Sequence, residues 1–76
     1  MHDYITKSQL REIEDAAWVT NDDFHKTLKK YTGIEARPYT AYLYYNDCGD
    51  FIGNSDEATL ESLLEAAYIE VRDDGT

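Results

Sequence analysis

The chain has 76 residues, of which 42% are hydrophobic and 13% aromatic, so it is long enough for one small domain and too apolar to be disordered. Its formal net charge of −9 opposes contact with nucleic acid and anionic membranes, and no apolar run approaches the roughly 20 residues of a membrane span. We therefore expect a single domain over residues 1–76, located in the cytoplasm and without a secretory signal.

The sequence contains no motif for catalysis or for ligand binding. The single cysteine, Cys48, excludes an intrachain disulfide, and the isolated His2 and His25 give no metal-ligand spacing with it. No nucleophile–base pair or phosphate-binding glycine loop can be identified. We expect a protein without enzymatic activity, metal or cofactor. Because a core of this size contributes only about 3–5 kcal/mol, we also expect a homodimer.

Two helices are predicted in the first half of the chain. Thr6 and Gln9 have the spacing of a capping box, and a hydrophobic stripe that begins at Leu10 follows them. Thr20 has the same capping position before a second helical segment, and Gly33 is a typical helix stop. The two helices should meet at a corner with almost no linker.

Pro38 is expected to close the helical half, and the remainder of the chain is predicted to contain most of the sheet. Residues 39–45 alternate as a strand does, and a turn leads to a short returning strand at 50–53. A third helix should open at 54–57, and residues 68–72 alternate again. The predicted order is α-α-β-β-α-β, an α+β domain with a short antiparallel sheet packed on its helices.

Seven tyrosines are many for so small a domain. Tyr42 and Tyr44 fall on the opposite strand face from Leu43, and a small domain can leave one sheet face uncovered. Tyr42 and Tyr44 are therefore our candidates for a homodimer interface, since tyrosine is enriched in interface cores. The alternative is that all the tyrosines pack in the core of one chain.

The charge is distributed unevenly along the chain. Residues 1–46 carry seven acids and six bases, whereas residues 47–76 carry nine acids and one base. These nine acids are the candidate partner-binding residues: Asp47, Asp50, Asp56, Glu57, Glu61, Glu65, Glu70, Asp73 and Asp74. A field of one sign concentrated in this way attracts basic partners and repels phosphate.

The third helix is expected to carry the most regular part of this field. Glu57, Glu61 and Glu65 recur every four residues, which places them on one helix face about 6 Å apart. That separation is in the range needed to imitate every second phosphate of a DNA strand, where the axial rise is about 3.4 Å. An ordinary solvated helix face is the alternative interpretation.

Three other interpretations have weaker support. Lys26, Lys29 and Lys30 form a small basic cluster, but lysines at a helix end commonly serve the helix dipole, so we expect no direct nucleic-acid binding. A metal site at Asn46, Asp47 and Asp50 lacks the spacing of an EF-hand loop. Cys48 and His25 share no motif that would link them as a catalytic pair.

Small size, well-formed caps and concentrated acid together resemble a class of small acidic inhibitors, often encoded by phages, that imitate DNA. The resemblance covers the charge pattern of residues 47–76. It implies a basic, DNA-binding host protein as partner, for example a histone-like architectural protein in the bacterial cytoplasm, inhibited by competition with DNA. The alternatives are an immunity or antitoxin protein that blocks a basic nuclease, and an acidic protein-interaction module.

Overall fold

The structure is a computed structural model that describes residues 3–74. Along the chain the elements are β1 (Tyr4–Thr6), α1 (Lys7–Ala16), α2 (Asn21–Thr32), β2 (Glu35–Pro38), β3 (Tyr42–Tyr45), β4 (Phe51–Asn54), α3 (Leu60–Ala66) and β5 (Glu70–Arg72). The predicted α+β class and the predicted order of helices and strands are confirmed, and the structure adds two short strands, β1 and β2.

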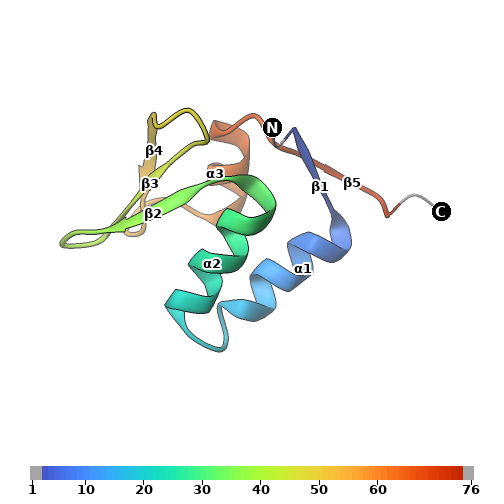
Figure 1. Ribbon diagram of the computed structural model, residues 1–76, viewed down its shortest axis with the longest axis horizontal. Helices are drawn as coiled ribbons and strands as arrows, with labels where there is room; N and C mark the ends of the chain where they lie inside the picture. Colours follow the sequence, from blue (N-terminus) through green and yellow to red (C-terminus); the bar gives the residue numbers. More distant parts are fainter. Residues whose placement is uncertain (1–2, 75–76) are drawn as a thin grey trace.

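The strands form two separate sheets, which lie toward opposite ends of the molecule with α2 and α3 between them (Figure 1). In the antiparallel sheet β3 is central, with β2 and β4 at its edges. The second sheet is the parallel pair β1–β5, in which Ile5 lies opposite Val71. The C-terminal segment therefore returns to the start of α1.

The helix boundaries follow the local signals in the sequence. The Thr6 side chain accepts from the backbone N–H of Gln9 while the Gln9 side chain accepts from that of Thr6, which completes the predicted capping box. Thr20 caps α2 through the N–H of Asp23, and Gly33 ends it with a φ of 73°. That left-handed conformation suits glycine because it has no Cβ.

The predicted strand at 39–45 is too long, and Pro38 has a different position from the one expected. Pro38 is the last residue of β2, opposite Tyr42, where an edge strand tolerates a missing N–H. Residues 39–41 form the connecting loop, closed by a 2.8 Å hydrogen bond from Tyr39 N–H to the Ala41 carbonyl. The strand itself is Tyr42–Tyr45.

A core of eight apolar residues joins all three helices to both sheets: Ile5, Ile13, Leu28, Ile34, Tyr44, Leu63, Leu64 and Ile69. The only buried polar residue in the described chain is Thr32, whose hydroxyl donates to the Leu28 carbonyl and accepts from Ile34 N–H. Both polar functions of this side chain are thus satisfied inside the core.

The face of β3 that packs on the helices is the tyrosine face, not the Leu43 face. Tyr44 is 4% exposed and belongs to the core, and Tyr42 is half-buried against it. The opposite face carries the exposed Phe51 beside Tyr45, with ring centroids 5.8 Å apart. The Arg37 guanidinium lies 4.4 Å from the Tyr45 ring centroid.

Candidate partner-binding surface

The β3–β4 turn displays Asp47 and Asp50. Asn46 organises it, because its side-chain oxygen accepts from the backbone N–H groups of Cys48 and Asp50, each at 2.9 Å. Gly49 supplies the positive φ of 88° that closes the turn. Since the turn is held by Asn46 and the backbone, both carboxylates remain exposed to solvent.

Asp56 and Glu57 lie in the connection between β4 and α3. The Asn54 side-chain oxygen accepts from the N–H of Asp56 at 2.9 Å and from that of Glu57 at 3.2 Å. The helix begins only at Leu60, because Thr59 is its N-cap and forms a capping box with Ser62. The predicted start at 54–57 is therefore wrong, and Glu57 is not on the helix.

Glu61 and Glu65 share one face of α3, one turn apart. A separation of four residues corresponds to about 6 Å along the axis. Both side chains are exposed, and within residues 3–74 neither forms an ion pair. The predicted row of three stacked glutamates is thus reduced to this pair.

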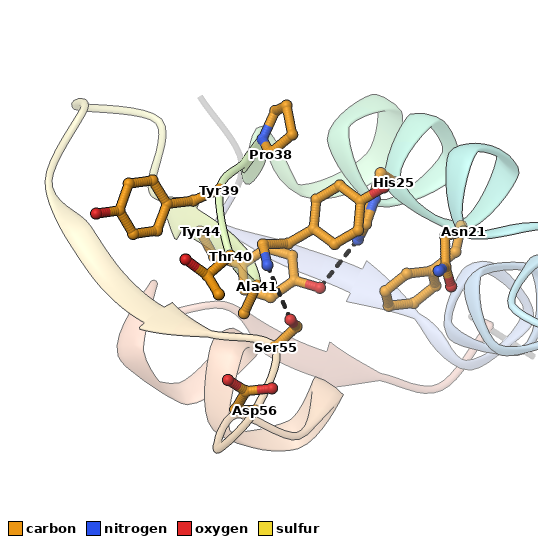
Figure 2. Close-up of a pocket in the computed structure, with 11 residues that line it drawn as sticks. Asn21, His25, Pro38, Tyr39, Thr40, Ala41, Tyr44, Ser55 and Asp56 are labelled. Carbon is orange, nitrogen blue, oxygen red and sulfur yellow. Dashed lines mark hydrogen bonds between the residues drawn. The ribbon is translucent and has the colours of Figure 1, made fainter.

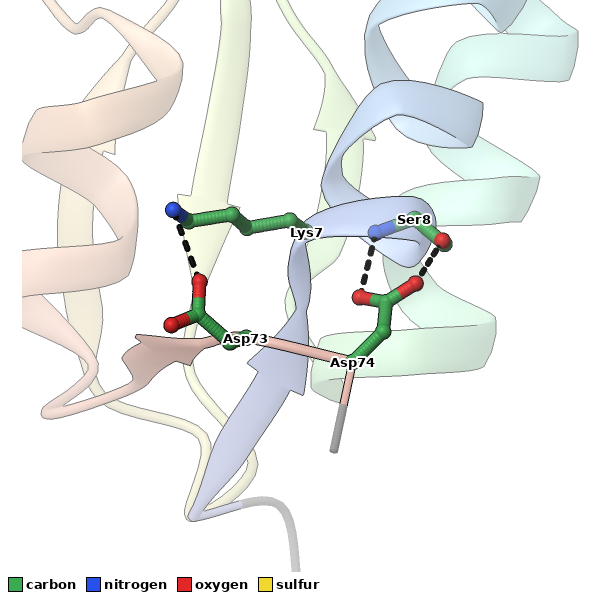
Figure 3. Close-up of polar contacts among 4 residues, drawn as sticks. All are labelled: Lys7, Ser8, Asp73 and Asp74. Carbon is green, nitrogen blue, oxygen red and sulfur yellow. Dashed lines mark hydrogen bonds and ion pairs between the residues drawn. The ribbon is translucent and has the colours of Figure 1, made fainter. Parts of the chain in front are cut away.

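The three C-terminal acids have partners inside the chain, and Figure 3 shows those of Asp73 and Asp74. Glu70 receives two hydrogen bonds from Arg72, at 3.0 and 3.1 Å. Asp73 pairs with the Lys7 ammonium at 2.8 Å, and Asp74 accepts from the backbone N–H of Ser8 at 3.1 Å and from the Ser8 hydroxyl. These three candidates are exposed, but much of their charge is engaged within the fold.

Hydrogen bonding shifts the pKa values at this contact. The Ser8 hydroxyl and N–H hold the pKa of Asp74 below its usual 3.8, and the hydrogen bond to Asp73 raises the pKa of Lys7 above 10.5. Ser8 lies in the first turn of α1, which has no acidic residue of its own. Asp74 therefore supplies the negative charge that the N-terminus of this helix favours.

A cavity of about 390 Å³ lies between α2 and the β2–β3 loop (Figure 2). Its floor contains Tyr44, whose hydroxyl is hydrogen-bonded to His25 Nε2 at 2.9 Å. The His25 ring also packs on Tyr42, with centroids 4.3 Å apart. Burial lowers the pKa of His25, against the opposing charge of Asp22, and burial raises the pKa of Tyr44.

This cavity changes the interpretation of the tyrosines. Because Tyr44 is buried in its own chain, it has little surface left for a dimer contact, and Tyr42 offers only part of its surface. A dimer contact through these two tyrosines stays a prediction. No pattern in the sequence indicates the role of His25, which packs its ring between α2 and β3. Its hydrogen-bond partner, the Tyr44 hydroxyl, lies 19 residues further along the chain, so no local sequence motif links the two residues.

Cys48 and His25 line different cavities, and within residues 3–74 no three His, Cys, Asp or Glu side chains gather as metal ligands would. In that same part of the chain, no helix combines the length and apolar character needed to cross a membrane. Comparisons with protein-family models, curated proteins and solved structures found no match.

Proposed function

We propose that this chain is an acidic inhibitor that binds a basic DNA-binding protein of a bacterial host cytoplasm and competes with DNA for it. The observation that carries the proposal is a set of six exposed carboxylates that lack an ion-pair partner within the described chain: Asp47, Asp50, Asp56, Glu57, Glu61 and Glu65. They occupy two consecutive connections and the helix that follows.

The mechanism is competition without a covalent step. Carboxylates take the place of phosphates against the Lys and Arg side chains of the partner, and complementary fields speed the encounter. Four of the seven cations pair with acids outside this set: Lys7 with Asp73, Lys26 with Asp22, Arg37 with Glu35 and Arg72 with Glu70. A basic partner therefore meets uncompensated charge at the six acids.

A displacement assay tests the proposal with a bacterial histone-like protein and a labelled DNA duplex. The chain should release the DNA, and the release should weaken between about 50 mM and about 200 mM salt. Changing Glu57, Glu61 and Glu65 together to lysine should slow association and weaken the complex. The matched control changes Asp3, Glu14 and Asp15 to lysine, avoiding Glu12 because it accepts a hydrogen bond from the Tyr31 hydroxyl.

The control variant should retain most of the displacement activity, since it alters the nearly neutral half of the chain by the same charge. A ternary complex, in which DNA and this chain bind the partner together without weakening each other, would contradict competition.

An immunity or antitoxin protein directed at a basic nuclease is the second candidate. It is favoured by the position of Glu57 off the helix, which leaves only Glu61 and Glu65 in a regular row. Recognition would then depend on the shape of one partner more than on phosphate spacing. Capture of a single nuclease from lysate, with no DNA competition, would favour this candidate.

A further inference from the structure

An apolar groove opens beside the acidic face of α3. Leu10 of α1, Leu64 of α3, Ile69 and Val71 of the β5 segment form its surface, and Glu61 and Glu65 stand at its edge. The groove spans about 420 Å³. Apolar side chains thus lie within reach of two carboxylates that have no ion-pair partner in the described chain.

The groove lies between α3 and the β5 segment, which pack against different parts of the fold. The N-terminal part of α3 packs toward β4, where Leu63 lies against Gly53, and β5 pairs only with β1 among the described strands. Val71 consequently remains 37% exposed although its pairing partner, Ile5, is fully buried. The result is a partly solvated aliphatic surface between α3 and the β5 segment.

The two glutamates make this surface selective for positive charge. Like charges four residues apart on a helix repel each other, and within residues 3–74 no cation pairs with Glu61 or Glu65 to relieve the repulsion. A ligand with a cation on either side of an apolar group would relieve the repulsion and cover Val71 and Leu10 at once. A purely apolar ligand would cover the aliphatic side chains without relieving the repulsion, and an acidic ligand would increase the repulsion.

We propose that this groove receives an aliphatic side chain of the basic partner, flanked by Lys or Arg residues that pair with Glu61 and Glu65. This inference rests on the proposed function and specifies where its partner is anchored. The apolar contact slows dissociation, and the surrounding charges speed association. The partner surface is therefore a basic segment with an exposed leucine, isoleucine or valine, not a uniformly cationic one.

Two synthetic peptides test the anchor directly. Both are alanine-based helices of about 16 residues with the same lysines, a length at which such helices begin to form in water. One carries a single central leucine and the other alanine at that position. Fluorescence anisotropy should show about tenfold tighter binding of the leucine peptide, as expected from burying one aliphatic side chain.

Variants of the chain locate the contact. Val71→Asp adds negative charge while removing apolar surface, so it should abolish the preference for leucine without weakening the alanine peptide. Glu61→Gln with Glu65→Gln should weaken both peptides. The control, Glu14→Gln with Asp15→Asn, removes the same charge from α1 and should leave the leucine preference intact. Circular dichroism and urea unfolding establish that each variant is folded.

Three results would overturn the groove proposal. The first is equal binding of the two peptides. The second is a preference for the leucine peptide that remains in a folded Val71→Asp variant. The third is self-association of the chain that Val71→Asp abolishes, together with no binding of either peptide. The proposed function fails separately, when DNA and the chain bind the histone-like protein together. A lost leucine preference with intact DNA competition would therefore reject the groove alone.

Discussion

Tyr68 is the residue with the most unusual backbone conformation in the described chain. Among residues 3–74 it is the one non-glycine residue with a positive φ, 58°, and its side chain is 90% exposed. The N–H groups of Tyr68 and Ile69 donate to the carbonyls of Glu65 and Leu64, the Schellman pattern that ends a helix. Glycine is the usual residue at this position, since a Cβ is unfavourable there.

Tyr68→Gly should therefore raise the free energy of unfolding by up to about 1 kcal/mol. Glycine removes the cost of the left-handed conformation, but part of this gain is lost because glycine also increases the entropy of the unfolded chain. Urea unfolding measures this change. Tyr68→Ala removes the exposed ring but keeps the Cβ, so it should give little gain. Equal stabilisation by both variants would mean that the ring, not the backbone, is the source of the strain.

His25 makes stability depend on pH near neutrality. Its pKa in the fold is lowered below 6.5 by burial, so the unfolded chain binds the proton more readily. The contribution of His25 is then fully present above about pH 6.5 and decreases as the pH falls through that value toward the lower pKa of the folded state. The urea midpoint should be higher at about pH 7.5 than at about pH 5.5.

His25→Gln keeps a hydrogen-bonding group near the Tyr44 hydroxyl but has no charge to gain in this range. The difference between the two pH values should shrink in this variant. If His25→Gln keeps the full difference in urea midpoint, another titrating group is its cause.

At the scale of elements, α1 depends on a residue from the other end of the chain. The Asp74 carboxylate accepts from Ser8 N–H, one of the N-terminal donors that have no partner within a helix. Asp74→Asn should lower the urea midpoint because it removes a charged acceptor from the positive end of the helix. Asp73→Asn, which breaks only the exposed pair with Lys7, should have the smaller effect.

The Asp74 contribution also has a defined pH window. Because the pKa is lowered in the fold, this stabilisation is present above the usual value of 3.8 and is lost as the pH falls through the lower pKa of the folded state. The difference between Asp74→Asn and the natural chain should disappear at the acid end of that range. A difference that stays constant with pH would show that the charge of Asp74 is not its cause.

At the scale of the whole molecule, the prediction of a homodimer concerns how the chain covers its apolar surface. Tyr44 is buried in its own core, so our candidate for the aromatic surface that meets a second copy is the outer sheet face, where the exposed Phe51 packs beside Tyr45. Sedimentation equilibrium should show a dimer, and Phe51→Lys should return it to the monomer. An 8.8 kDa monomer at concentrations up to about 100 µM would contradict the prediction.

The sequence alone determined those features whose causes lie within a few residues of one another. The caps at Thr6 and Thr20 and the stop at Gly33 are made by hydrogen bonds or backbone conformations of the local segment, so their residues are readable in order. The excess of acid after residue 46 is likewise a property of composition. These signals predicted the α+β class and the candidate acids, which the fold leaves exposed.

Tertiary structure decided which acids are unpaired and which sheet face is covered. The Asp74–Ser8 contact and the β1–β5 pairing join residues more than 60 positions apart, and Tyr44 is buried because α2 brings His25 to it. The alternation in β3 marks two faces without saying which one the helices cover, since both carry large apolar side chains. That choice depends on packing between distant segments, and no local pattern in the sequence encodes it.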